Sequence, residues 1–181
     1  GEIGASMRYL SQRFTAPNRV CMAVLTDVAT EELGHLEMVS TIVHQLTANL
    51  TVEEIENQGF ADYYVDHAVG IWPQSAGGIP FNSCEFQSKG DPVTDMFESM
   101  AAEQKARSTY DNILRVVRDI PEIADPIRFL RAREVVHFQR FGEALQSLQD
   151  QLNSKNFYQM NPSFDTGLTR EPCDCQGECV Q

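Results

Sequence analysis

Glu32-Leu-Gly-His35 and Glu134-Val-Val-His137 are two copies of one pattern, Glu-x-x-His, and each lies in a long stretch with helical periodicity. On a helix, residues three positions apart project from the same face. A carboxylate and an imidazole at this spacing can therefore reach one metal ion or one shared cavity. Two such helices could enclose two metal ions. In four-helix bundles built this way, the other two helices each supply one inward Glu. The sequence offers Glu2 and Glu103 for those positions.

The first copy lies on the apolar stripe of a predicted helix over residues 18–47. Apolar side chains recur there at steps of three and four, and Glu32 and His35 occupy two positions that such a stripe buries. The neighbouring Glu31 is four positions from His35, but it aligns with Asp27 on the polar face. We therefore predict that Glu31 is solvated.

Three further stretches complete the predicted helices. Residues 126–152 carry a stripe that includes the second copy, and residues 92–118 carry a stripe with one inward carboxylate, Glu103. A shorter helix is predicted from Glu2 to about Phe14. The fold class that follows is all-α, with a ferritin-like four-helix bundle over residues 1–155.

The other segments connect these helices or follow them. The connection between the second and third helices contains the capping box Thr51-Val-Glu-Glu54, which predicts a short helix that ends at Gly59. A crossover of this length lets helices two and three run parallel. Residues 156–181 form a polar tail with Cys173, Cys175 and Cys179. The spacing of these cysteines favours intermolecular cross-linking or disorder over a closed zinc site.

The predicted first helix carries Glu2 at its start and Tyr9 two turns later. Because a ligand at a chain end is poorly held and the sequence lacks an initiator Met, we expect that the natural N-terminus extends further. Tyr9 is either an ordinary core aromatic or a hydrogen-bond donor to Glu2. The isolated Cys21 and Cys84 are expected to be small buried or interface residues.

Several carboxylates in one buried layer require a positive partner. An ionised group inside a dry bundle is costly unless it is paired or binds a cation, so the aligned Glu side chains indicate bound cations. A buried network with Arg107, Arg131 or Arg133 is the alternative that the sequence leaves open.

Composition limits the classes of function. The chain has 181 residues, of which 42% are hydrophobic, and this suits one domain with a sizeable core. A net charge of -12 disfavours nucleic acid and anionic membranes as partners, because both require basic patches. No apolar run is long enough to span a membrane, and the start Gly-Glu-Ile-Gly lacks the layout of a signal peptide. We therefore predict a soluble protein.

Four segments resemble the manganese catalase family, in that family's order and spacing. They are Gly1-Glu-Ile-Gly-Ala-Ser-Met-Arg-Tyr9, Ala29-Thr-Glu-Glu-Leu-Gly-His-Leu-Glu37, Ala102-Glu-Gln-Lys-Ala-Arg107 and Phe129-Leu-Arg-Ala-Arg-Glu-Val-Val-His137. The closer resemblance is to the spore-coat branch in endospore-forming bacteria. The crossover segment Ala76-Gly-Gly-Ile-Pro-Phe81 resembles that branch as well. This resemblance implies a cytoplasmic or spore-coat location.

The resemblance also implies the cofactor and its ligands. Glu2 and His35 would bind one manganese ion, Glu103 and His137 would bind the other, and Glu32 would bridge the two manganese ions.

The same resemblance implies an activity, the disproportionation of hydrogen peroxide to water and oxygen. Glu134 would lie outside the coordination shell and carry protons from hydrogen peroxide to the leaving water. Tyr9 matches the family's tyrosine beside the first Glu. A homo-oligomer is expected, although the chain stops soon after the fourth helix, where longer members clasp neighbouring subunits.

Two other functions stay open at this point. A ferritin-like di-iron oxidase or peroxidase would use the same residues, because ligand identity discriminates poorly between iron and manganese. A structural coat protein, bound to other spore-coat proteins, would keep a vestigial or purely stabilising metal site.

Overall fold

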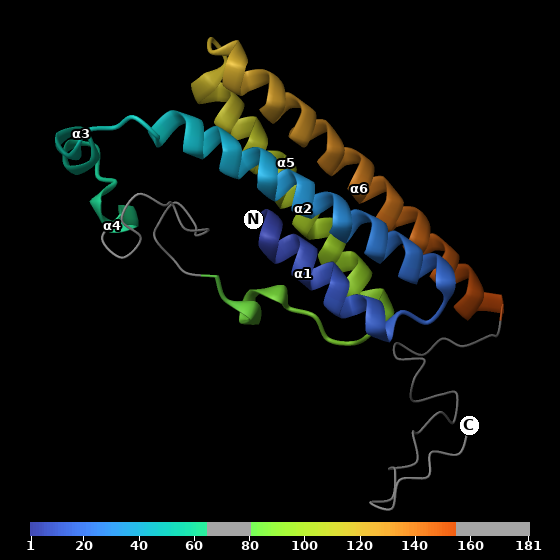
Figure 1. Ribbon diagram of the computed structural model, residues 1–181. Coiled ribbons are helices and arrows are strands. Elements are labelled where there is room, and N and C mark those ends of the chain that lie inside the picture. Colours follow the sequence, from blue (N-terminus) through green and yellow to red (C-terminus); the bar gives the residue numbers. More distant parts are fainter. Residues whose placement is uncertain (65–80, 155–181) are drawn as a thin grey trace, which may run out of the picture.

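Helices α1 (Glu2–Gln12), α2 (Arg19–Thr47), α5 (Pro92–Val117) and α6 (Pro121–Ser154) form a bundle in the computed structural model, which describes residues 1–64 and 81–154 (Figure 1). Shorter elements connect them: the 3-10 helices η1 (Arg13–Thr15) and η2 (Ser83–Phe86), and the helices α3 (Val52–Asn57) and α4 (Ala61–Tyr64). The described residues contain no strand, so the predicted all-α fold class is confirmed.

The long connection between α2 and α5 lets these two helices run in the same direction. Helices α1 and α6 run the opposite way, as the colour order in Figure 1 shows. Helix α1 packs on α2, α5 packs on α6, and contacts between α2 and α6 join the two pairs. The predicted crossover between the second and third helices of the bundle, α2 and α5, is therefore confirmed.

Side-chain caps fix where three of the helices begin. Asn18 caps α2 and Asp91 caps α5, and each side chain accepts a hydrogen bond from the backbone N–H three residues further on. Thr51 and Glu54 form the predicted capping box of α3. Gly59 follows in the left-handed region, at φ 76°, which suits a residue without a Cβ after a helix end.

Helix α6 begins at Pro121, not near residue 126 as the apolar stripe predicts. Proline fits a first helical position, because its fixed φ is helical and its missing N–H would have no partner there. Ala124 is fully buried and Ile123 packs against the core, so the additional turn adds apolar contacts. Pro126 is accommodated inside the helix.

Two apolar clusters fill the bundle. The larger takes side chains from α1, α2, α5 and α6, including Tyr9 and Phe141, whose rings are tilted by 59° with centroids 4.8 Å apart. The smaller contains the buried residues Tyr110, Ile127 and Leu130, with partly buried side chains of α2 packed against them. Each fully buried Leu or Phe contributes about 1.5–3 kcal/mol to folding. The segments of α2, α5 and α6 that lie between the two clusters carry the polar residues described below.

Several sequence predictions concern single residues or outlying segments. Cys21 is buried, whereas Cys84 is exposed, so of its two expected placements the buried one is wrong and the interface stays a prediction. The tail with its three cysteines, and the segment from Ala76 to Pro80, lie outside the described residues. Among the helices that are described, none combines the length and apolar character needed to cross a membrane.

Candidate metal centre

A layer of five polar side chains crosses the core between the two apolar clusters. Glu32 and His35 come from α2, Glu103 comes from α5, and Glu134 and His137 come from α6. Each of the five is at most 2% exposed. Residues from three helices that are far apart in sequence thus meet in one place, as the two Glu-x-x-His copies predict.

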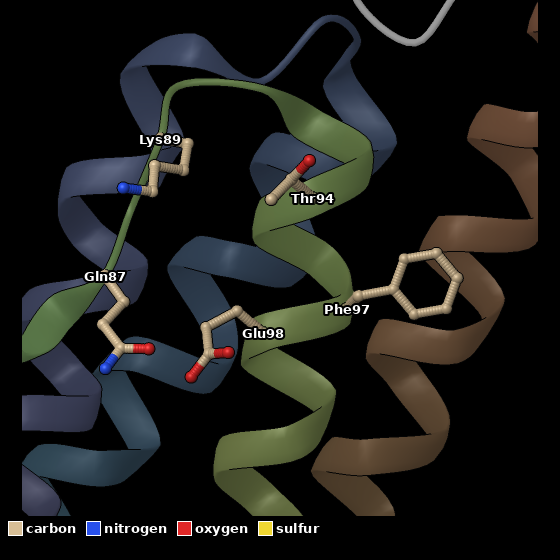
Figure 2. Close-up of a pocket in the computed structure, with 5 residues that line it drawn as sticks. All are labelled: Gln87, Lys89, Thr94, Phe97 and Glu98. Atoms are coloured by element: carbon tan, nitrogen blue, oxygen red, sulfur yellow. The ribbon is translucent and has the colours of Figure 1, made fainter.

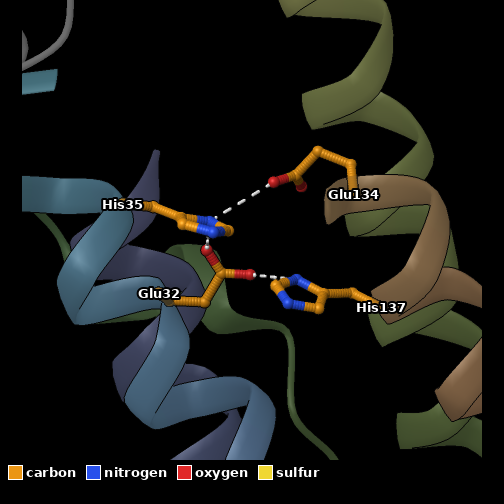
Figure 3. Close-up of side chains that lie close together, drawn as sticks. All are labelled: Glu32, His35, Glu134 and His137. Carbon is orange, nitrogen blue, oxygen red and sulfur yellow. Dashed lines mark hydrogen bonds and ion pairs between the residues drawn. The ribbon is translucent and has the colours of Figure 1, made fainter. Parts of the chain in front are cut away.

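Glu32 lies between the two imidazoles (Figure 3). One of its oxygens, Oε2, is 2.8 Å from Nδ1 of His35, and the other, Oε1, is 2.8 Å from Nδ1 of His137. The two imidazole rings are stacked, with centroids 5.3 Å apart and an interplanar angle of 19°. No other carboxylate among the described residues has an oxygen at 2.8 Å from both imidazoles.

Each imidazole also faces a second carboxylate. Glu134 Oε1 is 3.5 Å from Nδ1 of His35, and Glu103 Oε2 is 3.4 Å from Nδ1 of His137. Every carboxylate of the layer therefore approaches an Nδ1 atom, and the potential ligand atoms converge on the middle of the bundle.

These residues fit a bound divalent cation. One potential ligand atom from each of Glu32, His35, Glu134 and His137 lies within 4.8 Å of the others. Ligand atoms that share an octahedral cation lie about 3 Å apart, close to the distances observed here. Glu32 Oε1, Glu103 Oε2 and His137 Nδ1, all atoms of the predicted ligands, are also buried without a hydrogen-bond partner. Buried polar atoms rarely go unpaired, so a cation would satisfy atoms that the protein leaves unsatisfied.

Two buried tyrosines hold the outer carboxylates. Tyr9 donates a hydrogen bond to Glu103 Oε1, and Tyr110 donates one to Glu2 Oε1. Of the two alternatives for Tyr9, a core aromatic is confirmed, whereas a hydrogen bond to Glu2 is wrong, because Tyr9 points across the bundle to α5. Tyr110 lies in the predicted helix over residues 92–118 and is not among the site residues predicted above. Its spacing of seven from Glu103, two turns along the same face, is the signal that could have identified it.

Glu2 lies beside this layer, at the start of α1. Burial and the negative charge of Glu32 raise the pKa of Glu2 to about 7. The structure thus brings Glu2 to the other predicted site residues.

The electrostatics of the layer are dominated by crowded carboxylates. Burial raises the pKa of Glu134 to about 10, helped by the negative charges of Glu103, Glu32 and Glu2. Burial also opposes ionisation of Glu32, but the adjacent His137 and His35 outweigh it and lower the pKa of Glu32 to about 2. A bound cation would favour the ionised form of all these carboxylates.

Arginine side chains do not neutralise the buried carboxylates. Arg107 and Arg131 both pair with Asp111, and Arg133 pairs with Glu31. The alternative of a buried Glu–Arg network is therefore wrong for the described residues. Positive charge for the layer has to come from the histidines or from bound ions.

Glu31 is less solvated than the sequence predicts. Its side chain is 29% exposed, and its two oxygens lie 3.6 Å from Nε2 of His35 and 3.2 Å from Nε2 of His137. Burial raises its pKa, but the hydrogen bonds from Arg133 and the proximity of His137 lower that pKa to about 2. Glu31 is therefore ionised and adjacent to both imidazoles.

A separate open pocket lies where the chain enters α5 (Figure 2). It is lined by Gln87, Lys89, Thr94, Phe97 and Glu98. None of these residues belongs to the polar layer, and the pocket contains no histidine or cluster of carboxylates. We therefore assign the candidate site to the buried layer.

Comparison with known proteins identifies the family of the chain. The family model "Manganese containing catalase" matches residues 1–159. Protein CotJC of Bacillus subtilis strain 168 is 43% identical over 158 residues, which cover 87% of this chain and 82% of CotJC. A protein named "Probable manganese catalase" from Clostridium acetobutylicum is 30% identical over 157 residues, which cover 87% of this chain and 69% of that protein.

A solved structure agrees with these matches. The crystal structure of KatB, a manganese catalase from Anabaena, aligns with a TM-score of 0.74 and 29% sequence identity over 82% of this chain. The aligned part is 66% of KatB, so this chain spans about two thirds of that protein. The shared fold is the ferritin-like helical bundle. The family model matches most of this chain, and the chain covers more than two thirds of CotJC and of the Clostridium protein. This chain therefore belongs to the manganese catalase family.

Proposed function

We propose that this protein disproportionates hydrogen peroxide to water and oxygen at a pair of manganese ions. The observation that carries the proposal is Glu32, buried between two imidazoles with one oxygen on each. This is the placement expected of a carboxylate that bridges two cations. Family membership supports manganese as the metal.

Besides the bridging Glu32, the other four proposed ligands form two pairs, one for each ion. Glu2 and His35 would hold one ion, and Glu103 and His137 would hold the other. When bound, the two manganese ions together supply a centre that exchanges two electrons with peroxide. Three carboxylates and two neutral imidazoles nearly balance two divalent charges, which suits a buried site.

The residues of the chain then prepare the site for this chemistry. Tyr9 and Tyr110 donate to Glu103 and Glu2 and so fix the orientation of these two carboxylates. Burial raises the pKa of both tyrosines, and so do the neighbouring carboxylates, which keeps the phenols protonated as donors. The apolar clusters on either side keep bulk water away from the layer.

Glu134 is the proposed proton carrier. It is 1% exposed, and its Oε1 has no hydrogen-bond partner, so this oxygen is free to accept a proton from a peroxide O–H group. The same carboxyl can return the proton to the oxygen that leaves as water. A residue in this role stays ionised between turnovers only while nearby cations offset the surrounding carboxylates.

An oxygen electrode tests the proposal. Manganese-loaded protein should evolve oxygen from hydrogen peroxide, and Glu134→Gln should bind manganese but evolve oxygen about 100- to 10,000-fold more slowly, the usual contribution of general acid–base catalysis. Glu143→Gln, an exposed residue on the same helix, is the matched control. Equal rates for Glu134→Gln and the parent would rule out the proton role.

Elemental analysis of protein from its native source separates manganese from iron. Iron in the site with no oxygen evolution would favour the di-iron oxidase or peroxidase, since the ligands alone suit both metals.

The similarity to CotJC favours a second candidate, a structural protein of the spore coat. At 43% identity, CotJC is more similar to this chain than the Clostridium protein at 30%. Protein that binds manganese but leaves peroxide intact would support this candidate. Fractionation of spores would show whether the protein is in the coat.

A homo-oligomer is also proposed. Phe14 and Val116 are 80% and 83% exposed, and large exposed apolar side chains are typical of contacts between subunits. Light scattering tests the oligomeric state.

A further inference from the structure

The two nitrogens of each buried imidazole face different carboxylates. The Nδ1 atoms of His35 and His137 are approached by Glu32, Glu103 and Glu134, all of which belong to the buried layer. The Nε2 atoms of both rings are approached by Glu31 instead, and by no other carboxylate among the described residues. On each ring, Nδ1 thus faces the buried layer and Nε2 faces Glu31.

Glu31 divides its two oxygens between the two histidines. Oε1 is 3.6 Å from Nε2 of His35, and Oε2 is 3.2 Å from Nε2 of His137. Because the imidazole rings stack at an interplanar angle of 19°, their outer edges are presented to the same carboxylate. Both Nε2 atoms are buried without a partner in hydrogen-bond geometry, so Glu31 is the carboxylate placed to accept from them.

Arg133 holds Glu31 in this position from the facing helix. Its Nε atom is 2.5 Å from Glu31 Oε1, and its Nη2 atom is 3.0 Å from Glu31 Oε2. A two-point contact of this kind fixes the plane of a carboxylate as well as its distance. Glu31 immediately precedes Glu32, and Arg133 immediately precedes Glu134. Each member of the pair therefore lies directly before one of the two Glu-x-x-His copies.

We propose that the Glu31–Arg133 pair is a positioning device that holds the Nε2 proton of both histidines, so that both Nδ1 atoms present a lone pair to the metal ions. A metal-binding imidazole commonly donates its other N–H to a carboxylate, which fixes the tautomer and the ring orientation. One carboxylate here serves two imidazoles, so both metal sites depend on it. This inference rests on the metal site of the proposed function, but not on its peroxide chemistry.

Manganese affinity tests this inference without any measurement of turnover. The EPR signal of free aqueous Mn²⁺ is followed during titration of the full chain. Loss of such a carboxylate partner weakens metal binding by about 10- to 100-fold, and we expect that loss for Glu31→Ala. Glu31→Gln should lie between Glu31→Ala and the parent, because its single acceptor oxygen serves one imidazole while its NH₂ group faces the donors of Arg133. Arg133→Gln should weaken binding less than Glu31→Ala.

Asp27 and Arg140 provide the matched control. They form another ion pair between α2 and α6, on the same side as Glu31, but touch neither histidine. Asp27→Ala should bind Mn²⁺ within about twofold of the parent, which is within ordinary additivity error. Glu31→Ala with the affinity of the parent would overturn the inference, as would an equal loss in Asp27→Ala.

The tautomer gives a second, spectroscopic readout. In zinc-loaded protein with ¹⁵N-labelled histidine, His35 and His137 should carry their proton on Nε2, and Glu31→Ala should alter both signals. A proton on Nδ1 in the parent would overturn the inference. A parent protein that binds Mn²⁺ with this tautomer but evolves no oxygen would overturn the proposed catalase activity alone.

Discussion

Glu32→Gln should remove most of the stability that manganese gives to the protein. The substitution keeps the shape of the side chain but replaces one of its two acceptor oxygens by NH₂. Of the two 2.8 Å approaches to the imidazoles, only one can then be kept, and the bridge between the two metal positions loses its charge. Glu32 is fully buried, so water cannot replace the lost oxygen.

The size of the effect follows from the two contacts. Interactions with a charged group contribute about 1.5–3 kcal/mol each, so losing about 3 kcal/mol corresponds to roughly 100-fold weaker metal binding. At a free Mn²⁺ concentration 100 times the dissociation constant, one ion stabilises the parent by about 2.7 kcal/mol, which raises Tm by about 5–11 °C in a domain of this size. At the same Mn²⁺ concentration, the variant should gain only about 0.4 kcal/mol, or about 1 °C.

Differential scanning calorimetry with and without Mn²⁺ measures this difference. Each variant is compared with its own EDTA-treated sample, which cancels any effect of the substitution on the metal-free fold. Glu37→Gln, an exposed residue on the same helix, should keep the full shift. If Glu32→Gln also keeps the full manganese-dependent shift, Glu32 does not bridge the metal ions.

Three other predictions follow from the same site and its surroundings. Tyr110→Phe removes the donor to Glu2 and should weaken Mn²⁺ binding by about 10-fold, measured by competition with a chelator. Three groups bind more protons in the folded than in the unfolded state, because folding raises their pKa. They are Glu2, with a pKa of about 7, and Glu134 and His137, each with a pKa of about 10. The Tm of EDTA-treated protein should therefore fall as the pH rises from about 6 to 9, whereas manganese-loaded protein should show little change; a rising Tm for the EDTA-treated sample would contradict this sign. Phe141→Ala empties a fully buried position beside Tyr9 and should cost about 3–5 kcal/mol in urea unfolding, and a cost below 1 kcal/mol would show that this part of the core is loosely packed.

Helical periodicity was sufficient to predict the bundle and the layer. The stripes around Glu32, Glu103 and Glu134 are long, and each places a carboxylate where a hydrophobe belongs, so burial of all three could be predicted. The apolar stripe predicts too late a start for α6, because the turn from Pro121 to Ala124 carries too few apolar residues to extend a stripe.

The partners of the site residues could not be predicted in the same way. Periodicity assigns a side chain to a face of its own helix but does not say which atom it meets on another helix. Tyr9 therefore could not be matched to Glu103 in preference to Glu2. Glu31 looked solvated, because on α2 alone it lies beside Asp27, and only the approach of α6 brings Arg133 and His137 to it.

The division of the hydrophobic core into two clusters has a consequence for local unfolding. Because the larger cluster draws on four helices and the smaller one on fewer buried side chains, the two parts differ in intrinsic stability. In the proposed metal site, bound ions would hold these two parts together through the polar layer. Once they are removed, amide protons around Tyr110 and Leu130 should exchange with deuterium well before those around Leu25 and Phe141, so the bundle would open from one end.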